Sequence, residues 1–462
     1  MSLLQDSLKD RIDRFFTGQW YIFSLLLLSI AAHLLSLELV AYTFFALIAV
    51  YVCLIGNDFL PIVPLLVFSY IIPSANNNPG KTEASVFYSD WFFWIALTVV
   101  LSFLIFFVRN IKRLFTCKRK LIMGMGLLCV GYLLSGIGST DYTSVAGKNL
   151  FFAALQGLCL ILPYFFLSGG INWSKVRKEY LAWIGVCAGV LLVVEVLWSY
   201  INGGVIVEGV INRKMIFTGW GMYNNLGAML AMMIPFSFAL GAHYKKSWLG
   251  IVVGLVFTLG TIMTCSRTSL TAAVCIYIFC ALAVLFYGHS RKKIFMVLLG
   301  VVSAVLLAVL LLHKELLQLY SLFLKKITDP SSRHILFSEG WKVFREAPLF
   351  GSSFFSPGYQ PWDFATVDTF TALFPPRWHN TIVQLLASCG IVGLITYGFH
   401  RFQTIRLFFQ RKGYLRACIG CSIVVLLACC LLDCHFFNGG PVLFYSVQLA
   451  FLEFVPTTTQ EK

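Results

Sequence analysis

Long apolar runs separated by short polar links make up most of the chain. A membrane-spanning helix needs about 20 mostly apolar residues to cross the hydrocarbon core. Most runs reach that length, so the pattern predicts an all-α polytopic membrane protein with about 12–14 transmembrane helices. The predicted spans are residues 20–37, 39–56, 59–73, 91–108, 121–137, 149–168, 180–200, 223–241, 247–265, 268–287, 294–312, 380–399, 417–434 and 440–455.

The pattern divides the chain into three parts. Residues 1–312 form transmembrane helices with short loops, residues 313–378 form one long extracytoplasmic loop, and residues 379–462 form the C-terminal transmembrane helices. The second and third spans are the hardest to assign, because Asn57 and Asp58 leave a very short link and 59–73 is short for a crossing.

The long loop is predicted to contain helices of its own. HKELLQLYSLFLKKI has apolar residues at helical spacing, and Asp329-Pro-Ser-Ser offers N-cap residues before RHILFSEGWKVFREA. Pro348 and Gly351 end this second helix. Arg333, Phe337 and Trp341 follow one another at i, i+4 and i+8, so one helix face carries a cation and an aromatic stripe.

Composition and charge support this fold class. The chain is 59% hydrophobic and 12% charged, with a mean hydropathy of +0.82, which excludes an ordinary soluble globular protein. The net charge of +15 is a topology signal and does not indicate nucleic-acid binding. With the N-terminus inside, 23 of the 35 Lys and Arg fall on the cytoplasmic side, including those of HRFQTIRLFFQRKGYLR.

The 14 cysteines do not indicate a disulfide framework, because most lie inside apolar runs where cysteine behaves as a small hydrophobe. Cys418 and Cys421 have CxxC spacing, but no second Cys or His pair lies near them in the sequence. We therefore expect no metal and no cofactor.

Ionisable residues away from the span ends are His33 and Glu195. For His33, a hydrogen bond between helices is the favoured interpretation. Glu195 fits either a buried functional carboxylate or a structural one. A proton- or ion-coupled transporter is expected to carry more acidic residues near the membrane midplane.

The outer span ends carry the candidate chemistry. Arg213 precedes one span, Arg267 lies in a tight turn between two spans, Arg333 begins the loop helix, and His379 lies before the span at 380–399. Arginine binds phosphate oxygens bidentately, and a histidine can remove a proton from an attacking hydroxyl. Asn380 is placed to orient the imidazole or to contact a sugar. The pattern indicates an outward-facing site for a pyrophosphate-linked donor.

The same residues carry a family resemblance. TCSRTSLTAAVCIYIF resembles the Ser-Arg-small signature of the O-antigen ligase/polymerase family of bacterial membrane proteins. GWGMYNNLGAMLAMMIP resembles that family's Asn-containing span, and the series Arg333…Trp341…PLFG…His379-Asn380…GIVGL resembles its long outer loop and the next span. The resemblance covers roughly residues 205–400. One departure is GSSF at 351–354, where the family more often has Gly-x-Gly.

The resemblance implies a GT-C-like inverting glycosyltransferase of the bacterial cytoplasmic (inner) membrane, with its active site facing outward. It implies a polyprenyl-pyrophosphate-linked oligosaccharide donor and a glycan, lipid or protein acceptor, without a metal. On this pattern Arg267, Arg333 and His379 are catalytic, and Arg213, Asn380 and Trp341 bind substrate. The first outer link contains only Glu38, and not the paired acids of metal-dependent GT-C enzymes.

Several functions remain open on the sequence. Within the family, the chain fits a surface-polysaccharide polymerase, a ligase or a protein oligosaccharyltransferase. Outside it, the number of spans also suits a transporter or flippase, which is expected to tolerate substitution of His379. A third alternative is a structural partner in an envelope complex, in which both Arg267 and His379 are dispensable.

Overall fold

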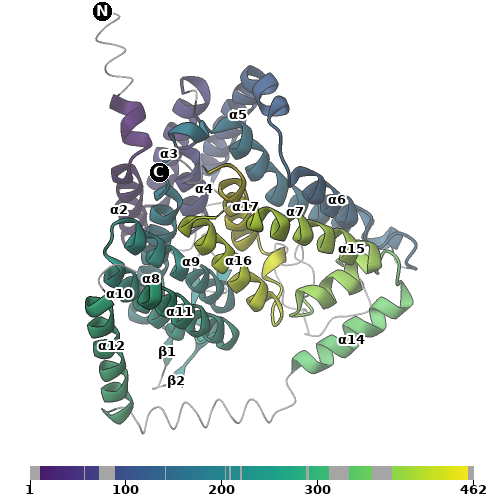
Figure 1. The fold of residues 1–462 in the computed structure, drawn as a ribbon. Coiled ribbons are helices and arrows are strands. Elements are labelled where there is room, and N and C mark those ends of the chain that lie inside the picture. The colour runs from purple at the N-terminus through teal and green to yellow at the C-terminus, as the bar shows by residue number, and fades with distance from the viewer. Residues whose placement is uncertain are drawn as a thin grey trace, which may run out of the picture.

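The chain folds into a bundle of helices with two very short hairpins, as a computed structural model shows (Figure 1). The structure describes residues 11–56, 58–71, 89–140, 142–202, 204–207, 210–218, 221–287, 291–311, 332–355, 377–410 and 412–455. The predicted helix HKELLQLYSLFLKKI and most of the loop after residue 355 lie outside these ranges. Each predicted span contains a helix, and the loop helix after Asp329-Pro-Ser-Ser is confirmed.

The first half of the bundle includes α2 to α8 and a 3-10 turn. Its elements are α2 (Gln19–Leu35), α3 (Glu38–Leu54), α4 (Ile62–Ile71), α5 (Asp90–Thr116), α6 (Ile122–Leu133), α7 (Tyr142–Gly170), η3 (Trp173–Lys175) and α8 (Tyr180–Asn202).

Between α8 and α9 lie two antiparallel hairpins and a 3-10 turn. Strand β1 (Ile206–Val207) pairs with β2 (Val210–Ile211), and β3 (Phe217–Thr218) pairs with β4 (Gly221–Met222) around η4 (Arg213–Met215). The remaining elements are α9 (Tyr223–His243), α10 (Ser247–Met263), α11 (Arg267–Tyr287), α12 (Arg291–Leu311), α14 (Ser332–Glu346), α15 (Thr381–Phe409), α16 (Tyr414–Cys430), η7 (His435–Phe437) and α17 (Gly439–Phe454).

Within the described residues, six helices are long and apolar enough to cross a membrane, namely α5, α7, α8, α9, α11 and α15. Several shorter apolar helices, including α2, α3 and α10, accompany them. The chain is therefore an all-α polytopic membrane protein, as the apolar runs predict. The total of about 12–14 spans stays a prediction, because helices such as α4 and α6 are shorter than a full crossing.

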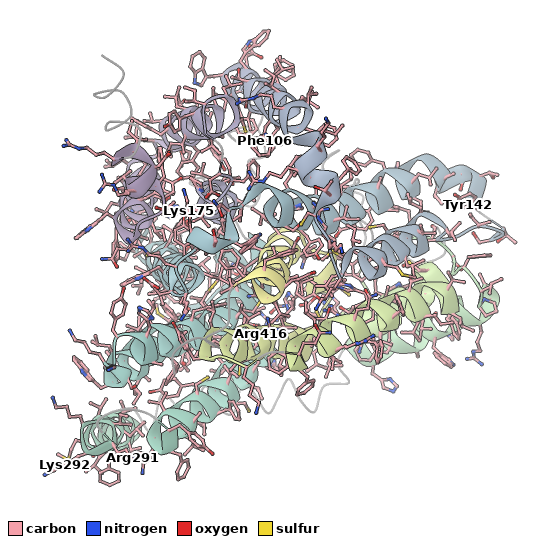
Figure 2. All side chains as sticks on the ribbon, turned by 45° about the horizontal axis from the view of Figure 1, so that its top comes forward. Phe106, Tyr142, Lys175, Arg291, Lys292 and Arg416 are labelled. Carbon is pink, nitrogen blue, oxygen red and sulfur yellow. The ribbon has the colours of Figure 1, made fainter. Side chains whose placement is uncertain are left out.

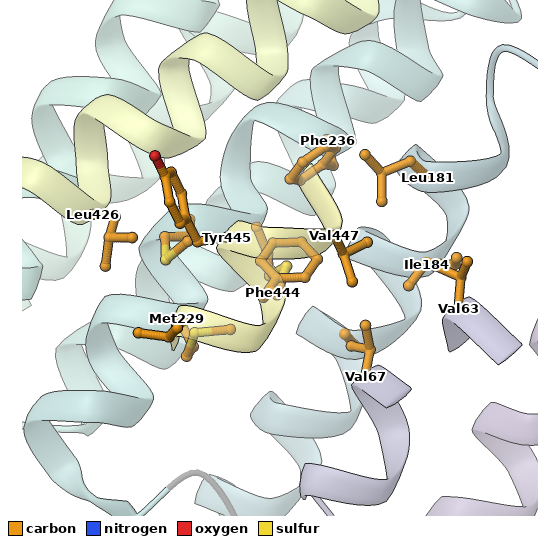
Figure 3. Close-up of a cluster of buried hydrophobic side chains, with 14 of the residues drawn as sticks. Val63, Val67, Leu181, Ile184, Met229, Phe236, Leu426, Phe444, Tyr445 and Val447 are labelled. Atoms are coloured by element: carbon orange, nitrogen blue, oxygen red, sulfur yellow. The ribbon is translucent and has the colours of Figure 1, made fainter. Parts of the chain in front are cut away.

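Helices α9 and α17 form the centre of the bundle. Helix α9 packs against α8, α10, α11 and α16, while α17 packs against α7 and α4. Figure 3 shows the core between them, where the rings of Phe236 and Phe444 lie 5.8 Å apart between centroids. Gly185 of α8 faces Phe236, and a Cβ there would lie 2.8 Å from the ring. Small residues thus allow close helix contact, as in other membrane bundles.

Helix α15 is broken at Gly390, which adopts φ 64 and ψ −160. The N–H groups of Ile391 and Val392 bond to Pro348 O and Leu349 O at 2.9 and 3.2 Å, in place of their own helix. On the other side of the break, Ala387 O accepts a bond from Ser352 N at 2.8 Å. The backbone after α14 therefore fills the gap in the hydrogen-bond ladder of α15, and fixes the end of α14 against the start of α15.

Helix α15 also continues well beyond the predicted span end at residue 399 and reaches Phe409. The sequence assigns Arg401 to the polar link that follows the span; in the structure its side chain is buried within the bundle. Its guanidinium carbon lies 4.4 to 4.7 Å from the ring centroids of Tyr397, Phe436 and Tyr445. Aromatic faces stabilise a desolvated cation, which explains why a charge is tolerated at this depth.

Candidate functional site

His379 lies immediately before the N-cap of α15. Its φ of 51 is uncommon for a residue with a side chain and indicates a conformation that the surrounding structure imposes. The imidazole Nδ1 lies 3.3 Å from Asp433 Oδ1, and the side chains are 33% and 12% exposed, respectively. A partly exposed imidazole thus rests on a largely buried carboxylate.

Asp433 follows the end of α16 and is held from three sides. Cys434 N donates to Oδ1 at 2.7 Å, and Asn224 Nδ2 donates to Oδ2 at 2.9 Å. Burial by itself raises the pKa of the Asp433 carboxyl, but the hydrogen bond with His379, the nearby His435 and the Cys434 N–H outweigh it. They hold this pKa below its ordinary value, so the carboxylate stays ionised at neutral pH.

The Asn224 side chain connects this pair to the turn that carries Arg267. Asn224 lies in the first turn of α9, and its main-chain carbonyl oxygen accepts a bond from Ser269 Oγ at 3.3 Å. Arg267 is the first residue of the same helix as Ser269, and it is partly buried. Gly227, one turn into α9, leaves room for the side chains of Thr264 and Ser269. The start of α9 therefore joins the Arg267 turn to the Asp433–His379 pair.

Arg213 belongs to the same region. It lies on η4, and its guanidinium carbon lies 4.7 Å from the ring centroid of Tyr223, the first residue of α9. The next asparagine, Asn225, accepts from Asn438 Nδ2 at 2.7 Å and lies 2.8 Å from His435 Nδ1. The first turn of α9 is thus contacted by polar groups from three separate segments of the chain: η4, the start of α11 and the link between α16 and α17.

Asn380 acts as a helix cap in the structure. Its side-chain oxygen accepts from Ile382 N and Val383 N at 2.8 and 3.0 Å, and its Nδ2 donates to Leu431 O at 2.8 Å. The imidazole of His379 is oriented by Asp433, a role that the sequence suggested for Asn380. The predicted sugar contact of Asn380 stays a prediction.

The loop helix α14 carries the remaining predicted site residues, Arg333 and Trp341. It packs on α15, where Gly340 lies against Val383 and Trp378. Arg333 is in its first turn, and the side chain lies outside what the structure describes. Trp341 is 49% exposed and lies 5.1 Å from Phe344 between ring centroids. Substrate contact by either side chain remains a prediction.

Arg377 has a structural role that fits its omission from the predicted catalytic residues. Its Nη2 donates to Phe437 O at 3.0 Å and to Asn438 Oδ1 at 3.2 Å. These bonds tie the segment before His379 to the link between η7 and α17. Arg377 therefore helps to hold the segment that carries His379 against the link between η7 and α17.

Sequence reasoning missed Asp433, Asn224 and His435. Asp433 was counted as the end of a span at 417–434, but α16 ends at Cys430. The link that follows reads LLDCHFFNGG, and its Asp, His and Asn lie on the predicted outer side between two apolar runs. That cluster is the signal that identifies the link as part of a site. The pairing of Asp433 with His379 has no signature in the sequence.

The two ionisable residues within the early spans lie together in the structure. His33 of α2 and Glu195 of α8 are buried, and Nδ1 and Oε1 are 3.7 Å apart. The two residues come from different helices, but the separation is longer than a hydrogen bond, so the predicted hydrogen bond of His33 is not formed here. Among the described residues, no group of three His, Cys, Asp or Glu side chains is placed to hold a metal ion.

Residues 252–398 match the family model described as O-Antigen ligase. The match confirms the family resemblance over this part of the chain, which contains Arg267, Arg333, Trp341, His379 and Asn380. Arg213, Asn224 and Asp433 lie outside the matched residues, so the structure alone connects them to the site. No curated protein was found to match the chain.

Proposed function

From the O-antigen ligase match and the geometry around His379, we propose that the protein is a membrane glycosyltransferase that uses a polyprenyl-pyrophosphate-linked glycan on the outer face of the bacterial cytoplasmic membrane. The observation that carries the proposal is the chain of contacts from Ser269, beside Arg267, through Asn224 and Asp433 to His379. It joins a cationic turn to an oriented imidazole, which are the two parts that this transfer requires.

In the proposed reaction, His379 is the general base. When the Nδ1–H group donates a hydrogen bond to Asp433, the lone pair of Nε2 is available to take the proton of the acceptor hydroxyl. The hydroxyl oxygen then bonds to the anomeric carbon as the bond from that carbon to the pyrophosphate oxygen breaks. This single displacement inverts the configuration and needs no covalent enzyme intermediate.

Arg267 and Arg333 are assigned to the pyrophosphate. The leaving group gains negative charge as its bond to the sugar breaks, and fixed guanidinium groups stabilise that charge. Arg213, near the start of α9, is assigned as a further donor contact, and Trp341 and Asn380 as contacts to the glycan. The acceptor distinguishes a polymerase, which joins repeat units, from a ligase, which transfers to another envelope molecule.

The test replaces Arg267, Arg333 and His379 singly with Ala in the native host, with surface polysaccharide separated on gels. We expect each variant to lose at least about 10²-fold in transfer, as for removal of a general base or a transition-state contact. The matched controls are Arg345→Ala and His334→Ala, both exposed on α14. Immunoblots verify equal protein abundance in the membrane fraction.

The outcomes separate the alternatives. Loss of long chains with retained single-repeat products identifies a polymerase, and loss of all transferred glycan identifies a ligase. Normal polysaccharide from all three variants contradicts the glycosyltransferase proposal. A transporter predicts that His379→Ala retains activity, and a structural partner predicts that both His379→Ala and Arg267→Ala do.

A further inference from the structure

A polar cavity lies at the opposite end of the bundle from the candidate site. It measures about 550 Å³ and lies at the beginning of α8, whereas the candidate site lies beyond the end of that helix. The segment before α2, the link between α3 and α4, the last turns of α5 and the η3 turn all contribute to its wall. The lining residues are Asp13, Arg14, Phe16, Thr17, Tyr51, Val52, Gly56, Asp58, Pro61, Arg113, Asn172 and Lys175.

The charged side chains of this cavity favour an anion. Arg14, Arg113 and Lys175 supply three cations against the carboxylates of Asp13 and Asp58. Asp58 Oδ1 is already used by the backbone, because it accepts from Leu60 N at 3.0 Å and Asn172 N at 3.2 Å. Within the described ranges no carboxylate lies at ion-pair distance from Lys175. Figure 2 labels this lysine beside the N-terminal helices.

An apolar cavity adjoins the charged one. It measures about 450 Å³ and is lined by Arg11, Ile12, Phe15, Phe16 and Tyr51. Phe16 and Tyr51 line both cavities, so the two share a wall. Phe15 is 45% exposed at the apolar cavity. A molecule that fills both spaces must be anionic at one end and apolar at the other.

We propose that this pair of cavities binds an anionic phospholipid. The phosphate lies among Arg14, Arg113 and Lys175, and the start of an acyl chain lies along Ile12, Phe15 and Phe16. A small soluble anion uses only the charged cavity and leaves the apolar one empty. Basic residues beside a bilayer attract anionic headgroups. Charge alone does not distinguish a lipid from a soluble anion, whereas an adjacent apolar groove also binds the acyl chain.

The test is a titration of the purified full-length protein, with lipid-bound species counted by native mass spectrometry. The probes are dihexanoylphosphatidylglycerol and dihexanoylphosphatidylcholine, which have the same chains and different headgroup charge. We expect tighter binding of the phosphatidylglycerol, and about tenfold weaker binding after Lys175→Glu. The matched control, Lys178→Glu, reverses the same charge three residues away, outside both cavities, and is expected to leave binding unchanged.

A second variant tests the apolar cavity. Phe15→Ser removes an exposed ring, so folding is expected to be unaffected, and phosphatidylglycerol binding is expected to weaken several-fold. Equal binding of the two lipids, or equal weakening by the Lys175 and Lys178 variants, contradicts the proposal. Displacement of the lipid by glycerol 3-phosphate at comparable concentration also overturns it, because the ligand is then a soluble phosphate.

Discussion

At the scale of single residues, the carboxylate of Asp433 gives His379 a defined orientation. Neither residue defines the site on its own, because the sequence does not show which polar groups meet. Their 3.3 Å contact, the bond from Asn224 and the burial of the carboxylate together direct Nδ1 toward Asp433, which leaves Nε2 for the proposed acceptor hydroxyl. A base with a fixed tautomer is more effective than one that samples two.

The first prediction concerns this orientation. Asp433→Asn keeps the shape of the side chain but removes its charge, and its amide can present an N–H to Nδ1, which favours the wrong tautomer. We expect transfer to fall by about 10²-fold, with the same phenotype as His379→Ala. Polysaccharide length on gels measures the effect, and equal membrane abundance excludes a folding defect.

The control for that variant is Asp90→Asn, an exposed aspartate in the first turn of α5. It makes the same chemical change away from the candidate site and is expected to leave the polysaccharide normal. If Asp433→Asn also gives normal polysaccharide, Asp433 does not set the tautomer, and the imidazole is oriented in another way.

At the scale of elements, the crossing of α15 with the segment after α14 determines where His379 and the loop helix lie. Gly351 and Gly390 both have positive φ, at 70 and 64. A Cβ on Gly351 would lie 2.3 Å from the carbonyl carbon of Ser388, and one on Gly390 would lie 2.4 Å from Leu349 O. Both contacts are with backbone atoms, which cannot move aside by a change of side-chain rotamer. The structure thus explains the glycines at 351 and 390, which belong to the PLFG and GIVG runs of the family resemblance.

The second prediction follows from this crossing. Gly390→Ala or Gly351→Ala should destabilise the protein by about 3 kcal/mol or more, because each combines a left-handed backbone with a clash against backbone atoms. Thermal unfolding of the purified protein in detergent measures the change. Gly398→Ala on the same α15 helix is the control, since a Cβ there meets open space. A melting temperature that is equally insensitive to all three changes contradicts the described crossing.

At the scale of the whole molecule, the links that line the lipid cavity and the links that form the candidate site lie at opposite ends of the bundle. Asp13, Thr17 and Lys175 line the same cavity, and the ring of Phe454 stacks on Trp173 with 5.4 Å between centroids. The described chain therefore begins and ends at one face, as Figure 1 shows. The starts of α9, α11 and α15 lie at the other. The excess of Lys and Arg in the short links predicts that the first face is cytoplasmic.

The third prediction tests this orientation. A fluorescent protein fused after residue 462 is expected to fold and fluoresce in the cytoplasm, and alkaline phosphatase fused within 313–330 is expected to be active outside. The reciprocal fusions are the controls and should both be inactive. The opposite pattern would place the His379 site in the cytoplasm and exclude an outward-facing transferase.

The apolar runs of the sequence are enough to predict the fold class and most of the helices. Long apolar runs have one stable arrangement in a bilayer, because every backbone polar group must be satisfied within a helix. The same local signals predict α14, which ends at Glu346, two residues before Pro348. Spacing and residue type also selected His379 and Arg267, since charged and polar groups at span ends are few.

Which of these polar groups meet depends on the packing of the helices and cannot be read from the chain. The partner of His379 comes from a link 54 residues away, and the segment that bridges it to Ser269 comes from α9. The sequence likewise gave no sign that Gly390 breaks α15 or that three aromatic rings surround Arg401. Such contacts depend on how helices cross, which apolar periodicity does not encode when every face of a helix is apolar.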